Sequence, residues 1–127
     1  MKEEDCRKIK QLGDKFIHKE LAKGRWFELS LAEQLGNIGS EVSRAAKWQR
    51  KDKQLFEGAV ERALELFDLT IMDSRWRVSR RLKEIGQARE VFCDAVFGGE
   101  EYGTTFQNLQ PYFDQFAFAA RKKINVT

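Results

Sequence analysis

Four arginines lie close together in the second half of the chain, with a tryptophan between the first two. They are Arg75, Arg77, Arg80 and Arg81, and the tryptophan is Trp76. Guanidinium groups neutralise phosphates and aromatic rings stack on bases, so surfaces that bind nucleic acid combine these residue types. The same pattern is also typical of a charged, solvated helix end. Both interpretations stay open at this point.

Carboxylates are concentrated in an earlier segment, where Glu61, Glu65 and Asp68 recur at helical spacing. One or two protein carboxylates are enough to hold Mg²⁺ together with a phosphate-bearing substrate. All-helical nucleotide pyrophosphatases use paired acidic motifs of this kind, but the chain has Glu65-x-x-Asp68 without a clear upstream Glu-x-x-Glu. A Mg²⁺-dependent hydrolase of phosphate esters or nucleotides is therefore the alternative function, and a salt-bridged surface is the simpler interpretation.

A polar row on the helix predicted before this segment supplies a second candidate group. Asn37, Glu41 and Arg44 belong to that row, and together with Glu65 and Asp68 they form a candidate polar cluster. A solvated face explains the row most simply. If the helix is buried on several sides, the row must pair with a neighbouring helix, because buried charges need partners.

Other reactive residue types are sparse. The only histidine, His18, has no second histidine with which to build a triad or paired Glu-x-x-His metal motifs. No glycine-rich phosphate loop occurs. Cys6 and Cys93 lack a CxxC spacing, so we expect two reduced thiols. The sequence therefore predicts no catalytic residue, no cofactor and no metal.

Composition places these residues in a single helical domain. The chain has 127 residues, of which 42% are hydrophobic and 34% charged, and this suits one globular domain over residues 1–127. The net charge of +3 is too small to demand nucleic acid as the partner. No run is long and apolar enough for a membrane span, and the charged start lacks a signal peptide. We expect a cytoplasmic protein that does not enter a membrane.

The strongest helical pattern spans residues 30–73, which read as a hairpin of two helices. Ser30 and Glu33 form a capping box at the first helix start, and Asp52 is a cap for the second. A band of small residues beside the apolar stripe, including Gly36, indicates close helix packing. Further helices are expected over about 2–23, 74–97 and 108–123, the last with Pro111 in its first turn.

These elements predict an all-α, up-and-down four-helix bundle over 30–123, preceded by an additional and less regular helix over 1–25. Alternating directions bring the start near residue 30, the turn at 73–77 and the end near 123 to one end of the bundle. We call the cations gathered there the basic pole. It consists of Arg25, Arg75, Arg77, Arg80, Arg81, Arg121, Lys122 and Lys123.

Three segments also carry a resemblance to a known group of proteins. They are EQLGNIGSEVSRA, ERALELFDLTIMD and YFDQFAFAARKK. They resemble a family of small uncharacterised prokaryotic helical proteins, over about Leu29 to Lys123. The resemblance implies a helical bundle and brings no activity, so no functional residue follows from it.

We favour a non-enzymatic binding protein over an enzyme. The basic pole is its predicted contact surface, and nucleic acid or a protein partner is the predicted target. A homodimer is expected as well, because ten Phe and three Trp are many aromatic residues for a chain of 127 to bury alone.

Overall fold

The structure is a computed structural model that describes residues 24–77, 80–98 and 103–126, and the secondary structure in these ranges is entirely helical. The elements are η1 (Arg25–Glu28), α3 (Leu31–Trp48), α4 (Lys53–Met72), α5 (Ser74–Arg77), α6 (Arg81–Val96) and α7 (Phe106–Val126). The predicted all-α class is confirmed. None of the helices in these ranges has the length and apolar content needed to cross a membrane. The helix expected over 2–23, with His18, lies outside the described residues.

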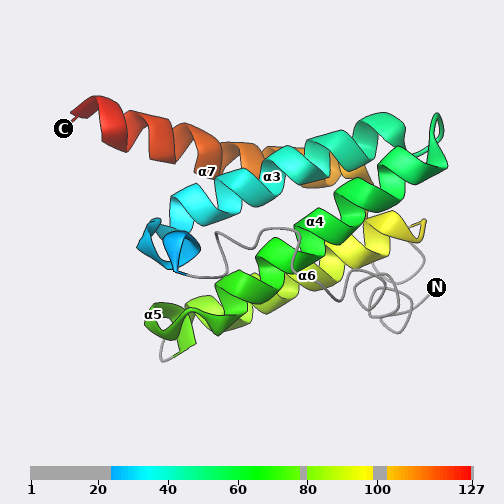
Figure 1. Cartoon of the computed structure of the whole chain (residues 1–127). Helices are drawn as coiled ribbons and strands as arrows, with labels where there is room; N and C mark the ends of the chain where they lie inside the picture. Colours follow the sequence, from blue (N-terminus) through cyan, green and yellow to red (C-terminus); the bar gives the residue numbers. More distant parts are fainter. Residues whose placement is uncertain (1–23, 78–79, 99–102, 127) are drawn as a thin grey trace.

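The four long helices pack in two neighbouring pairs (Figure 1). Helix α3 lies between α7 and α4, while α4 also packs against α5, α6 and η1. In Figure 1 each long helix runs in the opposite direction to the one before it. As a result, η1, α5, the start of α6 and the end of α7 lie at the same end of the molecule.

Local capping sets where the hairpin helices begin. The Ser30 hydroxyl accepts the Glu33 N–H at 3.1 Å, and the Glu33 carboxylate accepts the Ser30 N–H at 3.0 Å. Asp52 accepts the N–H of Leu55 at 3.0 Å at the start of α4. Each cap satisfies backbone donors that a helix start leaves unpaired. The predicted capping residues are confirmed.

The core forms where the apolar faces of these helices meet. Leu35, Ile38 and Val42 of α3 are fully buried, as their spacing predicts. Phe67 of α4 joins the helix pairs, because its ring centroid lies 5.7 Å from that of Phe92 on α6 and 6.1 Å from that of Phe113 on α7. Tilted aromatic pairs at such distances add stabilisation beyond the burial of apolar area.

Helices α3 and α7 approach closely because glycines line part of their contact. A methyl group added at Gly36 would lie 3.1 Å from the Ala117 Cα, and one added at Gly39 would lie 2.7 Å from the Phe113 Cβ. Neither distance leaves normal room for a side chain. The predicted close packing is confirmed at Gly36, and Gly39 extends it.

One expected helix boundary was wrong, and one expected helix is described only in part. The helix expected over 74–97 is described as two pieces, α5 and α6, on either side of residues 78–79, which are not described. Helix α7 begins at Phe106, where Thr105 and Asn108 exchange hydrogen bonds of 2.9 and 3.2 Å. Pro111 therefore lies beyond the first turn, where its missing N–H leaves one intrahelical bond unmade.

The thiol of Cys93 also differs from expectation. Cys93 is buried on α6 and is disulfide-bonded, so the expectation of a reduced thiol is wrong for this residue. The spacing of Cys6 and Cys93 in the sequence did not indicate a disulfide, because a disulfide depends on the distance between two cysteines in the folded chain. Cys6 lies outside the described residues.

Candidate nucleic-acid interface

A buried glutamine organises the end of the bundle at which the basic pole lies. Gln34 of α3 is fully buried. Its amide nitrogen donates to the Trp26 carbonyl at 3.0 Å and to the Asp73 carboxylate at 3.1 Å, and its amide oxygen accepts the Trp76 indole N–H at 2.8 Å. Since buried polar groups are costly unless bonded, this side chain fixes η1, the end of α4 and α5 relative to α3.

Asp73 ties Arg75 into the same network. The Asp73 carboxylate is 2% exposed and accepts the Arg75 backbone N–H at 3.0 Å and its guanidinium at 2.6 and 3.0 Å. Burial acts to raise the pKa of Asp73, but the hydrogen bonds from Arg75 and Gln34 outweigh it and hold the pKa below its ordinary value. The hydrogen bond to Asp73 in turn raises the pKa of Arg75. Arg75 also donates to the Leu29 carbonyl at 2.6 Å, so its guanidinium is a fixed part of the fold.

Trp26 closes the network on the core side. Its indole N–H donates to the Thr70 hydroxyl at 3.1 Å, and that hydroxyl donates to the Leu66 carbonyl at 2.8 Å. Trp26 is 1% exposed and Thr70 is fully buried. Trp26 therefore packs into the core.

Three planar groups meet where this network reaches the surface. The Arg75 guanidinium carbon lies 4.5 Å from the ring centroid of Trp76, and that of Arg81 lies 5.7 Å from it. The Trp76 ring is half-buried, while both arginines are exposed. A cation over an indole face is attracted by the ring quadrupole, so the cations and the ring hold one another in place.

The remaining predicted cations surround this group unevenly. Arg25, Arg77 and Arg80 are exposed, on or beside η1, α5 and the start of α6. Arg121 is exposed on α7, whose last turns continue past the start of α3 and away from α5 (Figure 1). Lys122 and Lys123 follow on the same helix, and their side chains lie outside the described part. The structure thus brings the arginines of η1, α5 and α6 to one end, and the last turns of α7 extend away from α5 at that end.

The candidate polar cluster divides into separate ion pairs, beginning with Glu41. Glu41 of α3 is 6% exposed, accepts the Arg62 guanidinium of α4 at 2.8 Å and pairs with Arg44 one turn along its own helix. The buried member of the row therefore has partners, as its burial requires. Asn37 is exposed and donates to the Glu33 carbonyl at 2.8 Å, which matches a solvated helix face.

The acidic residues of α4 do not gather into a metal site. Asp68 pairs with Arg89 of α6 at 3.6 Å, and Glu65 is 7% exposed. The pKa of Glu61 is raised by partial burial and then by the neighbouring Glu57 charge. Within the described ranges, no three His, Cys, Asp or Glu side chains could together hold a metal ion. The structure gives the Mg²⁺-dependent alternative no supporting geometry.

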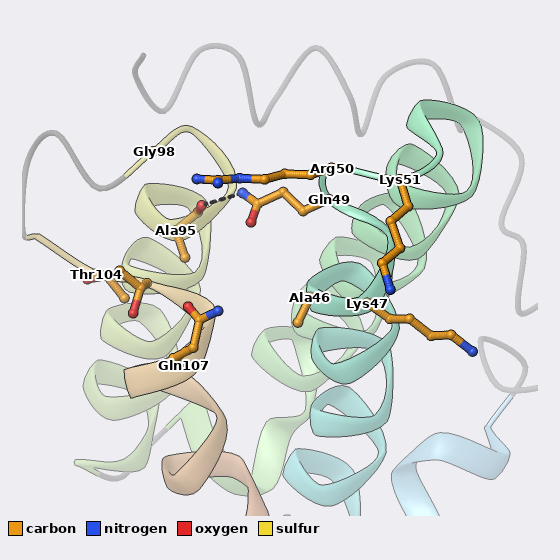
Figure 2. Close-up of a pocket in the computed structure, with 10 residues that line it drawn as sticks. Ala46, Lys47, Gln49, Arg50, Lys51, Ala95, Gly98, Thr104 and Gln107 are labelled. Carbon is orange, nitrogen blue, oxygen red and sulfur yellow. Dashed lines mark hydrogen bonds between the residues drawn. The ribbon is translucent and has the colours of Figure 1, made fainter.

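A polar pocket of about 390 Å³ opens at the other end of the bundle, between the α3–α4 turn and the facing ends of α6 and α7 (Figure 2). Gln49 spans it and donates to the Ala95 carbonyl at 3.3 Å. Arg50 reaches over the last turn of α6, while the amino groups of Lys47 and Lys51 point away from that helix (Figure 2). A cation beside a helix C-terminus is favourable without any ligand, so the position of Arg50 needs no bound anion to explain it.

The residues that sequence reasoning missed are Gln34, Thr70 and Asp73. Gln34 stands among the apolar positions of α3, three residues after Leu31 and four before Ile38. A polar residue on an apolar stripe signals a buried hydrogen-bonded group, and this signal was present. Asp73 was identified only as the end of the hairpin. Its hydrogen bonds were not predicted, because Gln34 is distant in the sequence and Arg75 belongs to the next helix, α5.

Comparison with known protein families, with curated proteins and with solved structures finds no match to this chain. The resemblance to a prokaryotic helical family therefore stays a prediction. The fold and the candidate site together define an all-α helical protein with arginines and tryptophan at one end.

Proposed function

We propose that this protein is a non-enzymatic binding protein that engages nucleic acid through the basic pole. The observation that carries the proposal is the Arg81 guanidinium over the anchored Trp76 ring, with exposed arginines at Arg77 and Arg80 between them in the sequence. These arginines are exposed, and the Arg81 guanidinium lies over the indole ring. Arginine beside an aromatic face suits both the phosphates and the bases of nucleic acid.

Arg75 has a different role from its neighbours within this proposal. Its guanidinium is bonded to Asp73 and to the Leu29 carbonyl, so replacing it would disturb the fold as well as the surface. Phosphate contacts are assigned to Arg77, Arg80 and Arg81 instead. A variant that includes Arg75 cannot separate loss of binding from loss of structure.

The test compares two variants that lose the same charge at opposite ends of the bundle. The first replaces Arg77, Arg80 and Arg81 by Ala, and the second replaces Lys47, Lys51 and Lys53, which are exposed around the α3–α4 turn. Affinity for RNA and DNA is measured by fluorescence anisotropy over a salt series. The arginine variant is expected to lose at least about ten-fold in affinity at about 50 mM salt.

The lysine variant is expected to bind nearly as well as the unmodified protein. If both variants weaken equally, only net charge matters and the basic pole is not the contact surface. If the unmodified protein binds neither RNA nor DNA, the proposal fails. A protein partner at the same surface then becomes the hypothesis to test.

A homodimer and a cytoplasmic location belong to the same proposal. Phe118 of α7, whose side chain is 63% exposed, is the residue through which a second copy is proposed to pack. The state of Cys93, which is disulfide-bonded in the structure, provides the test of this location, because disulfides are rare in reducing compartments. Alkylation of free thiols in rapidly quenched cells tests the location, since a cytoplasmic protein is expected to be labelled at Cys93.

A further inference from the structure

We infer that the basic pole takes single-stranded nucleic acid, with an unpaired base stacked on the planar group formed by Arg75, Trp76 and Arg81. This inference rests on the proposed function and names its target more narrowly. It depends on how rigidly the three planar groups are held and on how much of them stays accessible.

The indole edge of Trp76 is fixed from the inside. Its N–H donates to the Gln34 amide oxygen at 2.8 Å, and Gln34 is itself fully buried and bonded to Trp26 and Asp73. The ring therefore keeps one orientation before any ligand arrives. A platform that is already ordered loses little conformational entropy on binding.

The Arg75 guanidinium is fixed from the other side. Asp73 and the Leu29 carbonyl hold it while it lies 4.5 Å from the Trp76 ring centroid. Its side chain is still 40% exposed. Unpaired bases stack on arginine guanidinium groups as well as on aromatic rings, so this exposed guanidinium can contribute to the platform.

Duplex nucleic acid does not fit this arrangement. Bases inside a duplex are stacked on one another, so an aromatic platform reaches them only after they are splayed out. The exposed Arg77 and Arg80 lie between Trp76 and Arg81 in the sequence and supply cations for the phosphates next to a stacked base. The combination favours a flexible single strand over a rigid duplex.

The experiment compares an unstructured oligonucleotide of about twelve nucleotides with a duplex of the same length. The full chain is titrated against each, by anisotropy of the labelled nucleic acid and by tryptophan emission. The single strand is expected to bind at least about ten-fold more tightly and to quench the emission through base stacking. The duplex is expected to bind weakly without this quenching.

Two matched variants then locate the stacking. Trp76→Leu is expected to lower single-strand affinity about ten-fold and to leave duplex affinity unchanged. Trp48→Leu is the control, because Trp48 is also half-buried beside a cation, with the Lys47 amino group 4.9 Å from its ring, but at the other end of the bundle. It is expected to bind like the unmodified protein.

Equal affinity for single strand and duplex would overturn this inference and leave the proposed function standing. Equal effects of the two tryptophan variants would do the same. If the protein binds neither the single strand nor the duplex, both this inference and the proposed function fail. If Trp76→Leu unfolds, the unmodified protein provides the test instead. A base stacked on a half-buried tryptophan should quench its emission, so binding of the single strand without quenching would overturn the inference.

Discussion

The side-chain amide of Gln34 donates a hydrogen bond of 3.1 Å to the carboxylate of Asp73, across 39 positions of the chain. Both residues are buried. Asp73 also accepts hydrogen bonds from Arg75, so one carboxylate links the interior of α3 to Arg75 of the basic pole. The core and the proposed binding surface are therefore parts of one hydrogen-bond network.

Asp73 is expected to make stability depend on pH in the acid range. Its pKa is lowered in the folded protein, so the folded state binds fewer protons there than the unfolded state. The stabilisation is present above the unfolded pKa of about 4 and is lost as the pH falls through the lower folded pKa. Urea unfolding at a series of pH values measures this loss.

The matched variant is Asp73→Asn, which removes the titrating group. It is expected to be less stable at neutral pH by about 2 kcal/mol, because charged hydrogen bonds to Arg75 are lost. The difference from the unmodified protein should shrink as the pH falls. A constant difference at every pH would contradict the assignment.

Replacing two different glycines by alanine is expected to change the free energy of unfolding in opposite directions. Gly39→Ala is expected to lower the free energy of unfolding by about 1–3 kcal/mol, because the added methyl group would meet the Phe113 Cβ. Gly86→Ala on α6 meets no atom within 4 Å and is expected to raise stability by up to about 1 kcal/mol. Thermal unfolding followed by circular dichroism measures both changes. Equal shifts in the same direction would show that α3 and α7 do not pack as described.

The buried Glu41 is expected to stabilise the α3–α4 hairpin. Glu41→Ala removes the partner of Arg62 and Arg44 and is expected to cost about 1–2 kcal/mol, since both arginines are partly exposed and can rehydrate. Glu57→Ala is the control, because Glu57 is exposed and its removal should change stability by less than about 0.5 kcal/mol. Urea unfolding at neutral pH distinguishes the two. Equal losses would mean that the Glu41 pairs contribute nothing specific.

Arg80 provides a single-residue test of phosphate contact. Arg80→Ala is expected to weaken binding similarly for every nucleic acid and to reduce the slope of log affinity against log salt by about 1. Lys53→Ala at the other end should leave the slope unchanged. Anisotropy titrations at several salt concentrations measure both slopes. An unchanged slope in Arg80→Ala would remove this residue from the proposed contact.

Phe118 offers a test of the predicted dimer. Its side chain is 63% exposed on α7, and exposed aromatic surface favours association. Sedimentation velocity is expected to show a dimer for the unmodified protein and a monomer for Phe118→Ser. A monomeric unmodified protein would contradict the prediction, and a dimeric variant would place the interface elsewhere.

Features set by neighbouring residues were predictable from the sequence. Ser30 and Asp52 cap their helices as expected, because a cap depends on residues within one turn. The apolar stripe of α3 is buried as its spacing predicts. The start of α7 at Phe106 was missed, because Thr105 was not recognised as a cap and Asn108 was chosen instead.

Features that depend on the assembled fold were not predictable in the same way. Arg75 was grouped with its neighbours as a surface cation, and only the structure shows its bonds to Asp73 and Leu29. The partners of Glu41 and Asp68 were left open by the sequence, and the structure pairs Glu41 with Arg62 of α4 and Asp68 with Arg89 of α6. Which long side chains meet depends on helix rotation and tilt, and hydrophobic periodicity does not specify either closely enough.

The indole N–H groups of Trp26 and Trp76 are both bonded within the network around Gln34. A bonded indole proton exchanges with solvent only when its hydrogen bond opens. Trp26 is buried and bonded to Thr70 of α4, whereas Trp76 is half-buried and bonded to Gln34 of α3. Their two proton resonances therefore report on the inner and the outer part of this end of the bundle. If this end of the bundle opens as one unit, the two indole protons should exchange with deuterium at similar rates. A nucleic-acid ligand bound on the outer side should then slow the exchange of both protons.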